Sequence, residues 1–159
     1  MAQTISRLHI LGQMPPEFEE ILTEEALRFI GDLHAAFNRQ RLLLLAQRSL
    51  VQADLQKGRN PTFPEETAHI RAANWKVCDA PDDLIERRVE ITGPVERKMM
   101  INALNSGANV FMADFEDSLS PTWRNIVEGQ MNLKEAVRRT LTFFSSDGKR
   151  YALKDKTAT

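Results

Sequence analysis

The feature that most constrains this chain is an apolar run at residues 108–113, ANVFMA, with charged residues directly after it. The run does not alternate apolar and polar residues, which predicts a parallel strand covered on both faces. Such a strand needs helices packed around it. Three carboxylates, Asp114, Glu116 and Asp117, follow at once, so a predicted buried strand leads straight into negative charge.

Helices are predicted on both sides of this strand. Pro94 suits the first turn of a helix that ends at Gly107, and Ser120 with Pro121 suits the start of the next one. Asn132 can cap the helical stretch that follows it. The order helix, strand, helix indicates one α/β unit.

The last part of the chain predicts a hairpin. Asp147 and Gly148 are typical residues of a tight turn. They lie between two stretches with strand-forming residues, 141–144 and 150–153. The hairpin closes the chain after the α/β unit.

The first half of the chain predicts helices. Thr23 suits the cap of a first helix, in which apolar residues recur at helical spacing over 27–37. A second helix is expected from about Arg39 to Lys57, with Gly58 as the residue that ends it.

The four leucines 42–45 cover more than one face of this second helix, so they indicate either a core helix or a docking surface for a missing part of the protein. A short helix near residues 65–73 is expected inside a proline-containing connector, 61–92. The predicted division is residues 1–90, a helical segment with its connector, and residues 91–159, an α/β segment.

The three carboxylates are candidates for chemistry because the carboxyl ends of parallel strands carry the reactive loops of α/β proteins. If the extended conformation continues, Asp114 and Glu116 share one face and Asp117 points the other way. Two such acids can hold a hard cation such as Mg²⁺, directly or through its waters. A structural alternative is equally open, in which Asp117 or Ser118 caps the next turn and the other acids are solvated.

Composition excludes several other functions. The net charge is −1, from 21 basic and 22 acidic residues, and no basic cluster with interleaved aromatic residues occurs, so nucleic-acid binding is not expected. Cys78 is the single cysteine, which excludes an internal disulfide. No leader peptide or membrane-spanning run is visible, so we expect a soluble intracellular protein without a membrane partner. Arg87 and Arg88 could clamp an anion, but ion pairs with neighbouring acids are the better expectation.

The stretch DLIERRVEITGPVERKMMINALNSGANVFMADFEDSLSPTW, residues 83–123, closely resembles the malate synthase family. The segments ETAHIRAANWKV (66–77) and GQMNLKEAVRRTL (129–141) resemble it too. The resemblance implies an N-terminal helical clasp followed by a TIM barrel. It also implies condensation of glyoxylate with acetyl-CoA and water to malate and CoA in the glyoxylate bypass, with Mg²⁺.

The resemblance assigns Asp114, Glu116 and Asp117 to the rim of the metal site. It implies that Glu116 orders a metal-bound water or the catalytic arginine, and that none of the three binds the metal directly. The family's arginine, its acidic metal ligands and its aspartate base correspond to positions beyond residue 159. No catalytic residue is therefore expected in this chain.

A closed eight-stranded barrel needs roughly 250 residues, so we expect an N-terminal fragment with an incomplete barrel. The resemblance implies a cytoplasmic protein, or a peroxisomal or glyoxysomal one in a eukaryote. Two alternatives remain open. DFEDS (114–118) also resembles the acyl-CoA lyases of the citrate lyase β type, and the chain could be a non-catalytic interaction fragment.

Overall fold

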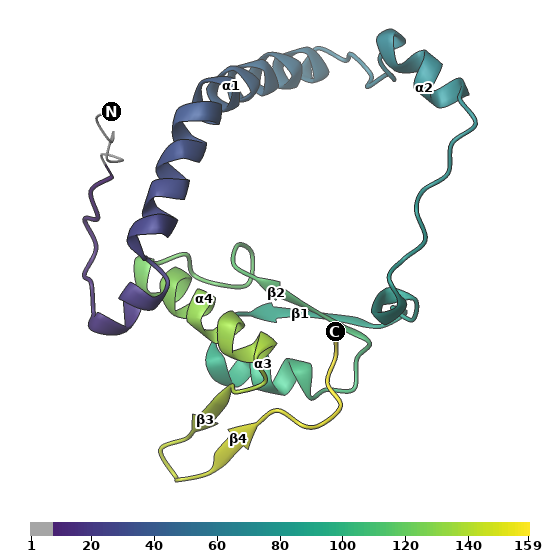
Figure 1. The fold of residues 1–159 in the computed structure, drawn as a ribbon. Coiled ribbons are helices and arrows are strands. Elements are labelled where there is room, and N and C mark those ends of the chain that lie inside the picture. Colours follow the sequence, from purple (N-terminus) through teal and green to yellow (C-terminus); the bar gives the residue numbers. More distant parts are fainter. Residues whose placement is uncertain (1–7) are drawn as a thin grey trace. The chain divides into compact units, whose positions relative to one another are not determined.

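A computed structural model describes residues 8–159 (Figure 1). The chain forms two compact units, which are described separately here. The helical unit contains residues 24–79, with residues 8 and 9. The strand unit contains residues 10–23 and 80–159.

The helical unit is dominated by one helix, α1 (Glu24–Gln56), of 33 residues. The prediction of two separate helices is wrong, because no proline interrupts the sequence near residue 38 and the helix continues through it. The predicted end is confirmed, since Gly58 follows with φ of +89°, a conformation that suits glycine. The predicted short helix is also present, as η2 (Glu65–Thr67) and α2 (Ala68–Ala72).

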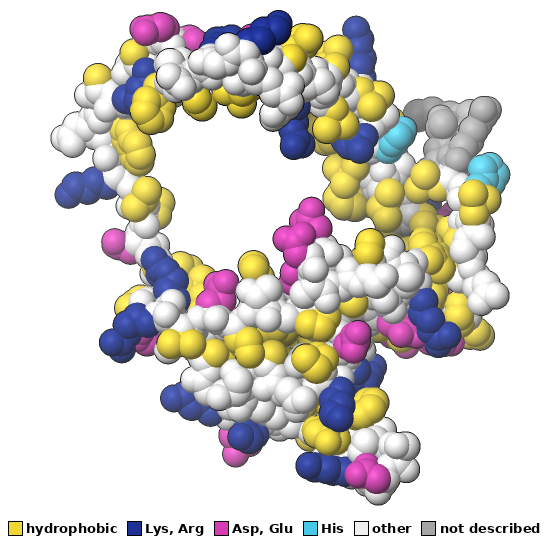
Figure 2. Space-filling view, turned by 180° about the vertical axis from the view of Figure 1, so that it is seen from behind, with side chains coloured by type: hydrophobic (Ala, Val, Ile, Leu, Met, Phe, Trp, Pro, Cys, Tyr) yellow, Lys and Arg dark blue, Asp and Glu magenta, His cyan; other side chains and the backbone are white. Residues whose placement is uncertain are grey.

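None of the residues of α1 is buried in this structure. Leu42, Leu43, Leu44 and Leu45 are 40–57% exposed, and hydrophobic side chains lie at the surface along this helix (Figure 2). Within the described residues, α1 is therefore not a core helix. That the leucines 42–45 form a docking surface remains a prediction. Beyond α2, the indole N–H of Trp75 donates to the Ile70 carbonyl at 2.9 Å. Cys78 is exposed.

The strand unit contains a parallel pair of strands joined by a helix. After the turn η3 (Asp82–Leu84), β1 (Glu90–Pro94) leads into α3 (Arg97–Leu104) and then β2 (Val110–Asp114). The two strands pair in register, from Glu90 opposite Val110 to Pro94 opposite Asp114. The run at 108–113 therefore forms a strand as predicted. The prediction for Pro94 is wrong, because Pro94 ends β1, and Glu96 is the N-cap of α3.

The second helix of the unit, α4 (Trp123–Val137), begins two residues later than predicted. Its N-cap is Thr122, whose hydroxyl accepts the Asn125 N–H at 3.2 Å, in place of Ser120. Asn132 caps no helix, since it lies inside α4 and is buried. The hairpin is confirmed: β3 (Thr142–Phe144) and β4 (Arg150–Ala152) pair antiparallel.

The core of the strand unit lies between β2, α3, α4 and the hairpin. Its buried centre comprises Val95, Met100, Ile101, Leu119 and Leu141. Phe111 and Ala113 of β2 pack against this centre, whereas Met112 on the opposite face is 49% exposed. The sequence predicted that both faces of this strand would be covered. Within this unit, one face of β2 packs on the core and the other is exposed.

Residues 10–23 join the strand unit through the short helix η1 (Pro16–Glu20), which contacts α4. Phe18 is 1% exposed, and Glu20 pairs with Lys134 of α4 at 3.0 Å. The Trp123 indole N–H donates to the Gln13 carbonyl at 2.8 Å. These contacts attach residues 10–23 to α4.

The last residues return to the second edge of β2. The Thr159 N–H donates to the Asn109 carbonyl at 3.0 Å, and the Phe111 N–H donates to the Thr159 carbonyl at 2.8 Å. β1 therefore lies on one edge of β2, and Thr159 pairs with the other edge.

Candidate functional site

The acidic loop, defined here as residues 114–118, begins at the carboxyl end of β2. Asp114 Oδ1 accepts the backbone N–H groups of Glu116 and Asp117 at 2.8 and 3.1 Å, and its Oδ2 accepts the Ser118 N–H at 3.0 Å. One carboxylate thus satisfies three backbone donors of the loop that it starts. These bonds turn the chain sharply at the end of the strand.

This geometry corrects the expected arrangement of the acids. The extended conformation ends at Asp114, so the face-sharing predicted for Asp114 and Glu116 does not apply. The structural alternative assigned the capping to Asp117 or Ser118, whereas in the structure Asp114 accepts the backbone N–H groups of this turn. The pKa of Asp114 is lowered, chiefly by the Glu116 N–H, while partial desolvation opposes the shift. Glu116 and Asp117 are exposed.

Two apolar side chains hold the acidic loop against the core. Leu119, which follows the loop, is 5% exposed, and Phe115 within it packs against the core cluster. Gly129 of α4 makes room for this packing, because a Cβ at that position would lie 2.7 Å from Cε1 of Phe115. The loop is therefore fixed by its own hydrogen bonds and by its contact with α4.

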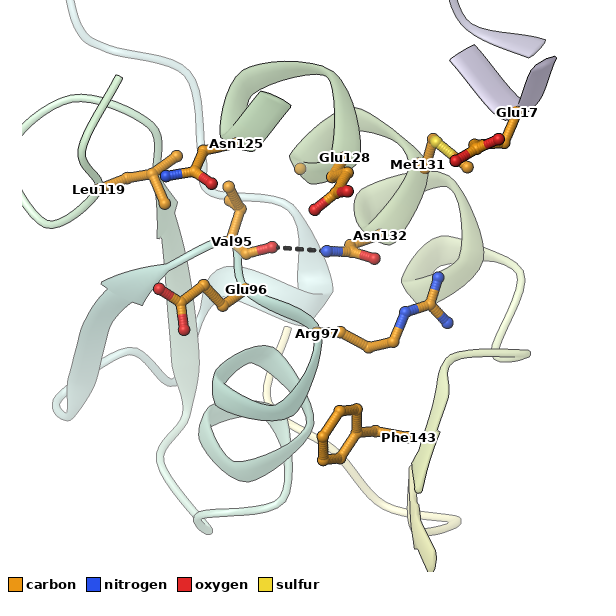
Figure 3. Close-up of a pocket in the computed structure, with 11 residues that line it drawn as sticks. Glu17, Val95, Glu96, Arg97, Leu119, Asn125, Glu128, Met131, Asn132 and Phe143 are labelled. Atoms are coloured by element: carbon orange, nitrogen blue, oxygen red, sulfur yellow. Dashed lines mark hydrogen bonds between the residues drawn. The ribbon is translucent and has the colours of Figure 1, made fainter. Parts of the chain in front are cut away.

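A cavity of about 380 Å³ lies near this loop, between the start of α3 and one face of α4 (Figure 3). Asn132 is 6% exposed and donates its amide N–H to the Val95 carbonyl at 2.9 Å, which ties α4 to the residue after β1. Glu96 and Glu128 line the same cavity. The sequence pattern predicts a helix cap at Asn132 and contains no signal for this cavity.

Arg97 also lines the cavity, but its guanidinium is already engaged. It makes two hydrogen bonds to the Glu135 carboxylate, at 2.6 and 2.7 Å, and a third to the Thr142 carbonyl at 3.1 Å. The hydrogen bond with Glu135 raises the pKa of Arg97 and lowers that of Glu135, with desolvation opposing both shifts. Arg97 therefore joins α3, α4 and β3.

The expected pairing near residues 82–88 is found for one of the two arginines. Arg88 binds both carboxylate oxygens of Glu86, at 2.6 and 2.8 Å. Arg87 donates to the Leu84 carbonyl at 2.5 Å. Both side chains thus have partners close in sequence.

Within residues 8–159, no group of three or more His, Cys, Asp or Glu side chains is placed to hold a metal ion. In the same range, no helix is long and apolar enough to cross a membrane. The acidic loop thus offers two exposed carboxylates at a strand end and no complete set of metal ligands among the described residues.

These features define an α/β chain with a helical N-terminal region and an acidic loop at the end of a parallel strand. Within that class, the chain is similar in sequence to malate synthases. The family model "Malate synthase, N-terminal domain" matches residues 7–69. Malate synthase of Myxococcus xanthus is 55% identical over 149 residues, which is 94% of this chain and 28% of the relative.

Two further relatives agree with this placement. Malate synthase A of Escherichia coli is 52% identical over 157 residues, 99% of this chain and 30% of the relative. A glyoxysomal malate synthase of Cucurbita maxima is 47% identical over 150 residues, 94% of this chain and 26% of the relative. The predicted resemblance is confirmed, and the chain spans less than a third of the length of these relatives.

Proposed function

We propose that this chain is part of a malate synthase, which condenses glyoxylate with acetyl-CoA and water to give malate and CoA. The observation that carries the proposal is an identity of 52–55% to malate synthases over 94–99% of the chain. Identity at that level covers the strands, the acidic loop and the helices together. The glyoxysomal relative supports a peroxisomal location in a eukaryote; in a bacterium the corresponding location is the cytoplasm.

We also propose that residues 91–159 begin a TIM barrel and that residues 1–90 form the clasp and connector. The in-register parallel pairing of β1 with β2 supports the first part, because neighbouring strands in such a barrel follow each other in sequence. The bonds of Thr159 to the other edge of β2 also support it, since a third strand would add there. The exposed apolar residues of α1 fit a clasp that packs on further protein.

The acidic loop is proposed as the rim of a magnesium site. Asp114 is occupied by three backbone N–H groups, so it shapes the loop, while the exposed Glu116 and Asp117 are free to accept hydrogen bonds from metal-bound water. Bound Mg²⁺ would supply electrostatic stabilisation of negative charge on the reacting aldehyde oxygen.

A chimera tests the proposal directly. Residues 1–159 replace the matching segment of the Myxococcus xanthus relative, and glyoxylate-dependent release of CoA from acetyl-CoA is measured with a thiol reagent. We expect activity within about tenfold of the parent enzyme, since hydrophobic cores tolerate many simultaneous substitutions that keep their volume and patterning. A folded chimera without activity would contradict the proposal. The 159-residue chain alone should release no CoA above background.

Within the chimera, Glu116→Gln should reduce activity by about 10- to 100-fold, the usual effect of losing an outer partner of a metal site. Asp155→Asn, at an exposed position outside the loop, is the matched control and should retain activity. Equal activity of the two variants would show that Glu116 has no role at the site.

The main alternative is an acyl-CoA lyase of the citrate lyase β type. The match of residues 7–69 to the malate synthase N-terminal domain favours the synthase. Cleavage of malyl-CoA or citramalyl-CoA by the chimera, without condensation, would favour the lyase. If neither reaction is found, the remaining reading is a non-catalytic interaction fragment, with the leucines 42–45 as its contact surface.

A further inference from the structure

Arg139 is held in a conformation that normally suits glycine. Its φ is +59°, and it is the one non-glycine residue with positive φ in the described range 8–159. It lies just after α4, where its N–H donates to the Ala136 carbonyl and the Thr140 N–H donates to the Glu135 carbonyl, both at 2.9 Å. This is the Schellman ending of a helix, and glycine is its usual residue. An arginine in this position is strained, which indicates a use for its side chain.

The guanidinium of Arg139 binds the segment that follows the hairpin. It donates to the carbonyls of Lys154 and Asp155 at 2.6 and 2.8 Å, and to the Thr157 hydroxyl at 3.2 Å. Asn105 holds the start of the same segment, because its side-chain oxygen accepts the Lys154 N–H at 2.9 Å. One side chain therefore contacts three residues of the segment that leads toward β2.

The segment held in this way reaches the edge of β2 at a defined position. Ala158 is buried and its N–H donates to the Leu104 carbonyl at 2.8 Å. Thr159 bonds to Asn109 and Phe111, on either side of Val110, as in a parallel strand pair. A shift by one residue would turn each side chain of this segment to the opposite face.

We propose that Arg139 is a positioning residue that fixes residues 157–159 in register on the second edge of β2. The bonds of the guanidinium to residues 154, 155 and 157 set how far along β2 the segment can reach. The same contacts keep that edge covered, and an uncovered strand edge is a template for pairing with another chain. This inference concerns the fold alone, so it stands or falls independently of the proposed synthase function.

The test compares two variants with a matched control in the 159-residue chain. Arg139→Gly keeps the helix ending and relieves the strain but removes the guanidinium, and Arg139→Lys keeps the charge without the three-way contact. Arg138→Ala is the control, since Arg138 is an exposed neighbour in ordinary helical geometry and its side chain has no hydrogen bond to the described residues 8–159. Amide hydrogen exchange is followed by NMR at Phe111 and Thr159, and at amides of the β1–β2 ladder.

In both Arg139 variants, exchange at Phe111 and Thr159 should become about tenfold faster relative to the β1–β2 ladder. In Arg138→Ala the ratio should stay as in the unmodified chain. The proposal is overturned if the ratio is unchanged in Arg139→Gly, or if the ladder amides accelerate to the same extent, because the guanidinium then has no local role at this edge. Using a ratio within one molecule separates the local effect from any change in global stability.

Discussion

Replacing Gly129 by alanine should destabilise the strand unit, although the same change usually stabilises a helix. Alanine is favoured over glycine inside a helix by about 1 kcal/mol. At this position, however, the new Cβ would lie 2.7 Å from Cε1 of Phe115 and still closer to Cγ2 of the buried Val95. Relieving such a clash in a packed core costs about 1–3 kcal/mol. The clash outweighs the helix gain, and we expect a net loss of up to about 2 kcal/mol.

Thermal unfolding followed by near-UV circular dichroism measures this loss. For a domain of 60–100 residues, 1 kcal/mol corresponds to a shift in Tm of about 4–8 °C, so a fall of several degrees is expected. Phe115→Leu removes part of the ring, so the double variant should lose less stability than the sum of the two single variants. An unchanged or higher Tm for Gly129→Ala would refute the reasoning, because the helix preference would then dominate.

Three further predictions concern single side chains. Glu135→Gln should lower the free energy of unfolding by about 1 kcal/mol at neutral pH. The folded pKa of Glu135 lies below its ordinary 4.5, so the contribution of the ion pair is present above pH 4.5 and is lost as the pH falls through the folded pKa. The free energies of unfolding of the variant and of the unmodified chain, measured by urea titration, should therefore converge in acid. A difference that does not change with pH would contradict the pairing. Asn132→Ala leaves the Val95 carbonyl unpaired and should cost about 1–3 kcal/mol in the same assay, whereas the exposed Gln130→Ala should be neutral. Asp114→Ala should speed amide exchange at residues 116–118 severalfold. Asp155→Ala is the control and should leave this exchange unchanged. Equal exchange rates in the two variants would show that the Asp114 carboxylate does not hold the loop.

The elements that the sequence predicted well have local signals. Asp147 and Gly148 define a turn within a few residues, and Gly148 has the expected positive φ of 80°. The short helix near residues 65–73 likewise begins directly after Pro64. Such signals need no knowledge of distant contacts, so they can be recognised in the sequence alone.

The errors arise where one residue satisfies two local rules. Pro94 suits the first turn of a helix, but it also suits the end of a strand that needs no further N–H donor. Its pairing with Asp114, twenty residues away in sequence, decides for the strand. Asn132 similarly resembles a cap, and its bond to Val95, 37 residues away, places it inside α4. Tertiary contacts therefore decide both cases.

For the candidate site, position was predictable and geometry was not. The apolar run correctly placed Asp114 at the end of a strand. Its carboxylate accepts the backbone N–H groups of residues 116–118, which ends the extended conformation assumed for Glu116. A sequence pattern gives no sign of whether an acid will bind its own backbone or face outward.

The two tryptophans of the chain lie one in each unit, and both indole N–H groups are hydrogen-bonded: Trp75 to Ile70 in the helical unit and Trp123 to Gln13 in the strand unit. Replacing either one by phenylalanine leaves a single tryptophan, whose emission can be excited selectively beside Tyr151. Emission from Trp75→Phe would then report on the strand unit, and emission from Trp123→Phe on the helical unit. The fluorescence denaturation curves of the two variants would coincide if the two units unfold together in one cooperative transition. They would have different midpoints if each unit unfolds independently.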